Sequence, residues 1–377
     1  MSRIDDGNPI VLKEIQRRIR EKGPITFEEF MDVVLYCPED GYYTAEREVW
    51  GKDGDYMTTI DISPVFGRVL TKQLYEMWSL LNRPEAFCLV EVGAGRGGLS
   101  SDILRTAKEL YPDFNRVLHL MVVERNPFLR GEDSNRFEKF ETIEEIPNNM
   151  IGCIISNELL DSFPVHIMVQ KDSLRELYVS LDGDDFIEVL DKPSTPRIIE
   201  YLNRLGVTLQ EGQRIEINLR ALDWIQKAGE LIKSGFVMTI DYGYAAREYF
   251  LPRKNGNLIC YYKHSVNEEP FRRVGFQDIT SHVDFSGLAL WGSDVDLEVT
   301  GFTTQFYFLL GVGVLEELEE VKEFDSKGVD SLIRNQGIKR LIMPGGMGDA
   351  FKVLIHHKGL DVNGLSGFSF KDFKEVL

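Results

Sequence analysis

The stretch F-C-L-V-E-V-G-A-G-R-G-G-L-S-S-D-I-L, which runs from Phe87 to Leu104, decides the fold of this chain. Its apolar beginning, Phe87–Val92, predicts a buried strand, and its last residues have the spacing of a helix. The glycines at 93, 95, 97 and 98 between them predict a tight turn, because glycine adopts positive φ angles at little cost. Such a turn directs the first N–H groups of the helix outward, and a ligand can then approach the backbone closely.

The acid Glu91 separates two ligand classes for this turn. The glycine spacing satisfies both the dinucleotide pattern G-x-G-x-x-G and the methyltransferase pattern E-x-G-x-G-x-G. A carboxylate two residues before the first glycine would repel a pyrophosphate, whereas it would attract the cationic amino-acid end of S-adenosylmethionine. The turn is therefore predicted to bind S-adenosylmethionine through Glu91, Gly93, Ala94, Gly95 and Gly97. An NAD-dependent oxidoreductase is the least favoured alternative.

Apolar strands alternate with helical segments along much of the chain. Further buried strands are expected to end at Glu124, Asn157 and Gly243. This alternation predicts an α/β fold with a doubly wound, mainly parallel sheet. Residues 165–217 contain short runs that alternate with period two, which predicts an antiparallel insertion. Two more strands are expected near residues 276–281 and 303–310.

The regions before and after this core have their own patterns. Residues 10–36 have helical spacing interrupted at Gly23-Pro24, and Thr26 is placed to cap the second helix. A loop rich in glycine and aromatic residues follows, and then a helix over residues 65–81. We expect four parts, which are an N-terminal helical lid (1–82), a catalytic core (83–165 and 218–314), an insertion (166–217) and a C-terminal extension (315–377).

Acidic residues follow the predicted strands, at the sheet edge where ligands of open α/β folds bind. Glu124 can accept two hydrogen bonds from ribose hydroxyls. Asn157, Glu158 and Asp161 follow the next strand in the core. If the turn there is helical, Glu158 and Asp161 share a face and can clamp a guanidinium and receive its proton. The alternative is that Asn157 caps a helix and the two acids are a surface pair.

Two other polar groups are candidate site residues. Asp241 ends the last core strand and either lines the substrate side or caps the next turn. His282 and Asp284 are spaced to lie on one strand face, where His282 can orient a substrate or relay a proton. A metal site would need a third ligand, for which His264 is conceivable, but three residues without a tight motif favour a hydrogen-bonded structural pair, so no metal site is predicted. The sequence contains no G-x-S-x-G, H-E-x-x-H or P-loop motif, which leaves hydrolase and nucleotide-triphosphatase functions without support.

Composition limits the partners and the compartment. The 377 residues carry a formal net charge of −18, which disfavours a nucleic-acid substrate and favours a basic protein partner. The four cysteines form no C-x-x-C pair, which indicates a reducing compartment. The first residues show no signal peptide, and no apolar stretch reaches membrane-spanning length. We therefore expect a cytoplasmic protein without membrane insertion, and a homodimer stays open.

With these motifs in place, the chain resembles the MidA-type family of class I S-adenosylmethionine-dependent methyltransferases. The resemblance covers about Ile25 to Leu354. The motifs that carry it are D-G-Y-Y (40–43), G-D-Y-M-T (54–58), V-E-V-G-A-G-R-G-G (90–98), N-E-L-L-D-S-F-P-V (157–165), I-D-Y-G-Y (240–244) and D-I-T-S-H-V-D-F (278–285). Mitochondrial members of the family are complex I assembly factors that dimethylate an arginine in a subunit of that complex.

The resemblance implies a seven-stranded class I core with a lid and an antiparallel insertion, S-adenosylmethionine as cofactor, and an arginine of a protein as methyl acceptor. From their positions after the strands, Glu158 and Asp161 are expected to orient the acceptor, with His282 and Asp241 as weaker catalytic candidates. The resemblance also places Asn157, Pro64 and Gly67 among the cofactor contacts. The family's usual Pro-Glu pair is replaced here by Ile60 and Asp61. A methyltransferase acting on RNA or a small molecule, and a cofactor-binding assembly factor without turnover, stay open as alternatives.

Overall fold

A computed structural model describes residues 6–47, 49–51, 54–55, 57–129, 137–251, 256–318 and 326–377. By its internal contacts the chain divides into two compact units. Unit 1 contains Met1–Met57, Leu160–Trp224 and Tyr244–Gly287, and unit 2 contains Thr58–Leu159, Ile225–Gly243 and Leu288–Leu377. The boundaries of these two units differ from the boundaries of the four parts expected from the sequence. The division into those four parts stays a prediction.

Unit 2 is built on a mixed sheet. Its strands are β2 (Phe87–Val92), β3 (Leu118–Val123), β4 (Glu138–Phe140), β5 (Met150–Asn157), β10 (Ile232–Tyr244), β15 (Glu298–Thr304) and β16 (Phe351–Lys358). Within the described ranges they follow the order β15-β16-β10-β5-β2-β3-β4, in which neighbours from β10 to β4 are parallel and the pairs of β16 are antiparallel. The predicted α/β fold class is confirmed. The chain leaves β2 toward β3 and β4, then returns to β5 on the other side of β2.

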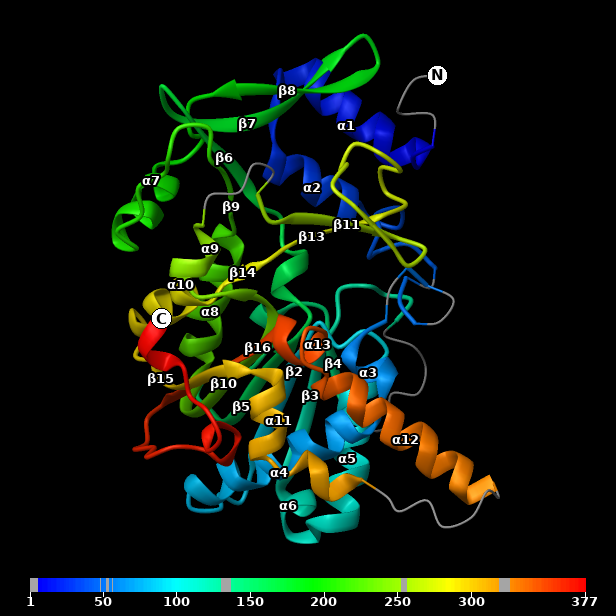
Figure 1. Ribbon diagram of the computed structural model, residues 1–377, viewed down its shortest axis with the longest axis vertical. Coiled ribbons are helices and arrows are strands. Elements are labelled where there is room, and N and C mark those ends of the chain that lie inside the picture. The colour runs from blue at the N-terminus through cyan, green and yellow to red at the C-terminus, as the bar shows by residue number, and fades with distance from the viewer. Residues whose placement is uncertain are drawn as a thin grey trace. The chain divides into compact units, whose positions relative to one another are not determined.

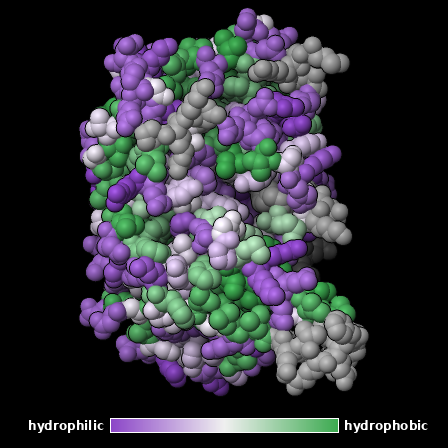
Figure 2. Space-filling model, viewed as in Figure 1, coloured by the Kyte–Doolittle hydropathy of each residue, from purple (hydrophilic) through white to green (hydrophobic). Residues whose placement is uncertain are grey.

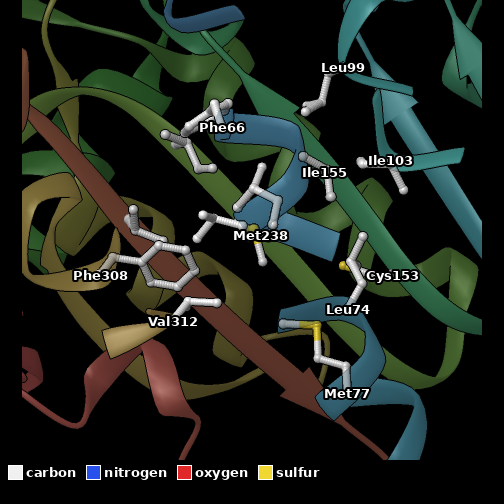
Figure 3. Packing of buried hydrophobic residues seen from close by; sticks show 14 of the residues in the cluster. Phe66, Leu74, Met77, Leu99, Ile103, Cys153, Ile155, Met238, Phe308 and Val312 are labelled. Atoms are coloured by element: carbon white, nitrogen blue, oxygen red, sulfur yellow. The ribbon is translucent and has the colours of Figure 1, made fainter. Parts of the chain in front are cut away.

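Helices cover this sheet because their apolar residues recur every three or four positions. They are α3 (Thr59–Ile62), α4 (Val65–Leu80), α5 (Gly98–Leu110), α6 (Pro112–Val117), α11 (Gln305–Gly311), α12 (Ser326–Ile342) and α13 (Met347–Ala350). Figure 1 shows α4, α5, α11 and α12 in front of the sheet. Figure 3 shows Phe66, Leu74 and Met77 of α4 packed with Ile155 of β5 and Met238 of β10 in the buried cluster.

The helix α12 is buried on one side only. Ile338 and Leu341 are fully buried, whereas Val329 is 48% and Ile333 is 63% exposed. Figure 2 shows apolar surface over this helix, next to polar side chains. None of the helices in the described ranges combines the length and the apolar character needed to cross a membrane.

Unit 1 is smaller, and its sheets are antiparallel. One sheet has the path β1-β7-β6-β9 with β8 paired to β7, and another has the order β12-β11-β13. The elements that lie wholly in this unit are α1 (Pro9–Lys22), β1 (Ile25–Thr26), α2 (Phe27–Tyr36), β6 (His166–Lys171), β7 (Ser173–Asp182), β8 (Asp185–Asp191), α7 (Pro196–Arg204), β9 (Arg214–Ile217), α9 (Ala246–Tyr249), β11 (Leu258–Tyr262), β12 (Ser265–Asn267), β13 (Asp278–Ser281) and β14 (Val283–Asp284). The helices α8 (Leu219–Leu231) and α10 (Phe285–Ser293) have residues in both units.

Several local predictions for unit 1 are confirmed. The helical region 10–36 breaks after Lys22 and resumes at Phe27, and the Thr26 side chain accepts a hydrogen bond from Glu29 N at 3.0 Å. The antiparallel runs of the insertion are β6, β7 and β8. α1 and α2 pack on this sheet, as Figure 1 shows, and the rings of Phe27, Phe30 and Phe271 meet in its core.

The strand expected at residues 303–310 is wrong. The strand β15 ends at Thr304, and Gln305–Gly311 form the helix α11. The Thr304 side chain accepts a hydrogen bond from Tyr307 N at 3.4 Å, so this residue caps a helix where the aromatic run suggested a strand. Phe308 and Leu309 of this helix are fully buried in the core of unit 2, and this packing outweighs the strand preference of aromatic residues.

Candidate functional site

The site lies at the carboxyl ends of the parallel strands of unit 2. In register, Val92 of β2 pairs with Val123 of β3 and Ser156 of β5, and Asn157 of β5 pairs with Ile240 of β10. The residues that follow these positions therefore lie along one edge of the sheet. The chain changes direction between β2 and β5, and such a switch point is where open α/β sheets bind ligands.

The turn after β2 has the conformation expected from its glycines. Gly93, Gly95 and Gly97 have φ angles of +76°, +54° and +72°, a region that other residues adopt only with strain. Gly93 N and Ala94 N both donate to Val123 O, at 2.9 and 3.2 Å, and Gly97 is the N-cap residue before α5. A Cβ atom at Gly93 would lie 2.8 Å from Cδ1 of Leu159. The predicted strand, turn and helix are confirmed.

Two carboxylates accept hydrogen bonds from backbone N–H groups at this turn and in the first turn of α5. Glu91 is 3% exposed, and its Oε2 accepts hydrogen bonds from Ser100 N at 3.0 Å and from Ser100 Oγ. Glu124 accepts hydrogen bonds from Gly95 N at 2.8 Å and from Asn126 N at 2.7 Å. Burial raises the pKa of Glu91 to about 7, the bonds from Ser100 oppose this rise, and the charge of Glu124 adds to it.

This arrangement decides which ligand charge the turn accepts. A pyrophosphate site needs free N–H groups at the start of a helix, but here Ser100 N and Gly95 N already bind carboxylates. Two acids beside the turn favour a cation. Each carboxylate oxygen has two lone pairs, so Glu91, which binds Ser100 through Oε2, keeps acceptor capacity for an ammonium group. The residues present therefore fit S-adenosylmethionine better than a dinucleotide.

The carboxylate of Glu158 lies at the end of β5. Its backbone has a φ angle of +53°, and its N–H donates to Ile240 O at 3.0 Å. Its Oε1 accepts hydrogen bonds from Thr59 N and Thr59 Oγ1, both at 2.8 Å, and from Asn157 Nδ2 at 3.2 Å. Burial raises the pKa of Glu158 to about 7; the bonds from Thr59 oppose the rise, and the charge of Asp241 adds to it.

Asp241 belongs to the same sheet edge. It is fully buried in β10, and its Oδ2 accepts a hydrogen bond from Leu159 N at 3.2 Å. Its Oδ1 accepts one from Tyr242 N at 2.8 Å. Asp241 therefore helps to hold the turn after β5, and its two expected roles, lining the substrate side or capping the turn after its own strand, stay predictions.

The other predicted catalytic residues lie in unit 1. Asp161 is buried in the 3-10 turn Leu160–Ser162. Glu158 precedes this turn with a left-handed backbone, so the helical spacing expected to put both acids on one face is wrong. His282 lies between β13 and β14, with its ring 5.1 Å from that of Tyr244.

The expectation that His282 and Asp284 share a strand face is also wrong. The strand β13 ends at Ser281, before His282. Asp284 instead accepts hydrogen bonds from Ser286 N and Gly287 N, both at 3.1 Å, and one from the hydroxyl of Tyr201 at 2.7 Å. Its carboxylate therefore caps the first turn of α10, and a structural role accounts for its contacts.

Pro64 and Gly67 have local structural roles. Pro64 is exposed at the start of α4. Gly67 is buried inside the same helix, where an added Cβ would lie 2.6 Å from Cβ of Asp102 in α5. Gly67 thus permits close packing of the two helices, and cofactor contacts of both residues stay a prediction.

The sequence did not point to Thr59 and Ser100. These residues are the hydrogen-bond partners of Glu158 and Glu91, the two carboxyls whose pKa burial raises to about 7. The T-T-I-D string contained a signal for α3, because Asp61 Oδ2 accepts hydrogen bonds from Thr58 N and Thr58 Oγ1, at 3.1 and 2.8 Å, as in a capping box. The aspartate at 61 therefore has a local function in this chain. Ile60 packs toward the start of α5, where Cγ2 is 3.0 Å from the Cβ position of Gly98.

Known proteins resemble this chain in sequence and structure. Residues 69–303 match the family described as putative S-adenosyl-L-methionine-dependent methyltransferase. The mitochondrial protein arginine methyltransferase NDUFAF7 homolog of Drosophila melanogaster is 26% identical, over 98% of this chain and 90% of its own. The human mitochondrial protein arginine methyltransferase NDUFAF7 is 27% identical, over 94% and 85%. A likely methyl transferase from Burkholderia thailandensis has a crystal structure with bound S-adenosyl-homocysteine. This structure matches the present one with a TM-score of 0.87 and 25% sequence identity, over 98% of this chain and 97% of its own.

These relatives correct one expectation. From the sequence alone, a cytoplasmic protein is expected. The similar proteins of Drosophila melanogaster and Homo sapiens are named mitochondrial, which contradicts that expectation.

Proposed function

The chain belongs to this family of S-adenosyl-L-methionine-dependent methyltransferases, and we propose that it methylates an arginine side chain of a protein. The resemblance, the enzyme class and the cofactor predicted from the sequence are confirmed. The arginine acceptor is supported by the names of the similar proteins from Drosophila melanogaster and Homo sapiens. A subunit of respiratory complex I is the proposed target, on the resemblance described above.

The cofactor is proposed to lie along the turn after β2. Gly93, Ala94, Gly95 and Gly97 leave the backbone accessible, Glu91 receives the ammonium group, and Glu124 receives the ribose hydroxyls. Asn157, Pro64 and Gly67 complete the proposed contacts. The cofactor supplies a methyl group on a positively charged sulfur, and the two acids of the turn favour that charge.

The proposed acceptor site rests on one observation, the unequal hydrogen bonding of the two carboxylate oxygens of Glu158. Three donors hold its Oε1, whereas its Oε2 has no hydrogen-bond partner in the described part of the chain. The open oxygen can accept an N–H of a guanidinium and orient the nitrogen that takes the methyl group. As the N–CH₃ bond forms and the S–CH₃ bond breaks, Glu158 takes the proton released from that nitrogen. Asp161, Asp241 and His282 are proposed to assist in orienting the acceptor.

The finer fold prediction is part of this proposal. It is a seven-stranded class I core (83–165 and 218–314) with a helical lid (1–82), an insertion (166–217) and a C-terminal extension (315–377). The strand order of unit 2 contains seven strands in its main path, and it supports the strand count of this core, although β16 (Phe351–Lys358) lies within the proposed C-terminal extension. A basic protein partner, without nucleic acid, is proposed from the net charge of −18.

The test is transfer of labelled methyl groups from S-adenosylmethionine into a lysate of a strain that lacks the gene. We expect label in a protein band, and methylarginine on mass spectrometry of that band. Label in RNA or in a small molecule would refute the arginine acceptor. Glu158→Gln should bind the cofactor by calorimetry but transfer no label, whereas Glu230→Gln, a change at an exposed residue of α8, should do both. Equal loss of binding and transfer in Glu158→Gln would refute the proposed role of Glu158.

A further inference from the structure

Thr59 is a fully buried polar residue that the sequence analysis did not select. We propose that Thr59 is a positioning residue for methyl transfer, which holds one oxygen of the Glu158 carboxylate and thereby presents the other to the acceptor. This inference rests on the proposed function of Glu158. It adds a specific requirement, namely that the hydroxyl of Thr59 acts through its bond to the ionised carboxylate.

The hydrogen-bond network fixes the direction of the Thr59 hydroxyl. Asn157 Nδ2 donates to Thr59 Oγ1 at 3.1 Å, so the hydroxyl oxygen accepts on that side. The hydroxyl proton then goes to Glu158 Oε1 at 2.8 Å rather than to Asn157 Oδ1 at 3.4 Å. With Thr59 N at 2.8 Å and Asn157 Nδ2 at 3.2 Å, Oε1 accepts three bonds. A further N–H donor can therefore bind only at Oε2 without displacing one of them.

The chain around Thr59 makes its N–H available for this bond. Thr58 and Asp61 form the capping box of α3, in which Thr59 is the first helical residue. The N–H of a first helical residue has no partner inside the helix, so it can donate to Glu158. The other end of the contact is fixed as well, because Glu158 N donates to Ile240 O and Leu159 N donates to Asp241. Both partners are thus held by their own backbones.

The proposed bond has a measurable electrostatic effect. Hydrogen bonds to a carboxylate favour its ionised form, and the Thr59 bonds oppose the burial that raises the pKa of Glu158. Thr59→Val removes the hydroxyl but keeps the shape and the N–H. The pKa of Glu158 should therefore rise further, by about one unit for one bond to a charged group. Thr59→Ser keeps the hydroxyl and should preserve the native value.

The first experiment is a pH–rate profile of labelled methyl transfer between pH 5 and 9. We expect the acid limb of kcat/KM for the native protein near pH 7, where Glu158 ionises. Thr59→Val should move this limb up by about one pH unit, with activity recovering at pH 9, and Thr59→Ser should restore it. Thr106→Val, at a buried threonine that donates to Asp102 O within α5, should leave the limb in place. A uniform loss in Thr59→Val at every pH, or identical behaviour of the valine and serine variants, would overturn the proposal.

The second experiment needs no methyl acceptor, so its result is independent of whether arginine is the substrate. Urea unfolding is measured for the native protein, Thr59→Val, Glu158→Gln and the double variant at pH 5 and pH 9. We expect Thr59→Val to cost more stability in the native background than in the Glu158→Gln background at pH 9, with a smaller difference at pH 5. Equal costs in both backgrounds at pH 9 would show that the hydroxyl does not act through the ionised carboxylate, and would overturn the inference.

Discussion

Replacing Glu91 with glutamine should change stability and cofactor affinity in opposite directions. Burial raises the pKa of Glu91 from 4.5 to about 7, so the folded state favours the protonated acid. The stability from this preference is fully present below pH 4.5 and is lost as the pH rises through 7. A gap of about 2.5 units corresponds to about 3 kcal/mol. Glutamine has no charge to desolvate, so Glu91→Gln should be more stable than the native protein by up to about this amount above pH 7, and not at pH 4.5.

The assay is urea unfolding of the native protein, Glu91→Gln and the surface control Glu230→Gln at one-unit steps from about pH 4 to about pH 9. Calorimetric titration with S-adenosylmethionine at pH 8 gives the second readout. There, loss of the charged partner of the ammonium group should weaken binding about tenfold or more. A stability difference that does not change with pH would refute the burial argument. Unchanged affinity at pH 8 would refute the assignment of Glu91 to the ammonium group.

Three further changes test the packing around the site. Gly93→Ala should lower both stability and cofactor affinity, because its φ of +76° costs about 1 kcal/mol with a side chain and the Cβ meets Leu159 at 2.8 Å; Leu159→Ala in the same protein should restore part of the loss in a thermal melt. Gly67→Ala should cost about 1–3 kcal/mol in urea unfolding, since its Cβ would lie 2.6 Å from Cβ of Asp102. Asp61→Ala should cost about 1 kcal/mol by loss of the capping box of α3, whereas Asp61→Asn should cost less in the same assay.

The parts of the site that the sequence predicted correctly are those with a local cause. The turn after β2 follows from glycines and an acid within seven residues, 91 to 97, and its φ angles are the ones that glycine permits. The order of apolar strands and helices likewise follows from short patterns. Thr26 and Asp61 cap helices within three residues of their own positions, so propensity and structure agree there.

The parts that the sequence did not predict depend on distant contacts. Thr59 and Glu158 are 99 positions apart, and no pattern in a single sequence links them. The left-handed backbone of Glu158 is held by Ile240, from another strand, so helical spacing was the wrong guide for this residue. The aromatic run after Thr304 has strand propensity, but its burial in the core of unit 2 selects a helix.

The position of β16 between β10 and β15 determines when the sheet of unit 2 can be completed during synthesis. Its residues Phe351–Lys358 pair with β10 on one side and with β15 on the other, although both partners are synthesised well before it. All three segments of unit 1 precede Leu288. All residues of unit 1 are therefore synthesised before β16. Until β16 is made, the edges of β10 and β15 that pair with it have no partner strand. We expect a chain truncated before Phe351 to keep these edges unpaired. Unpaired strand edges can pair with strands of other copies, so such a chain should aggregate.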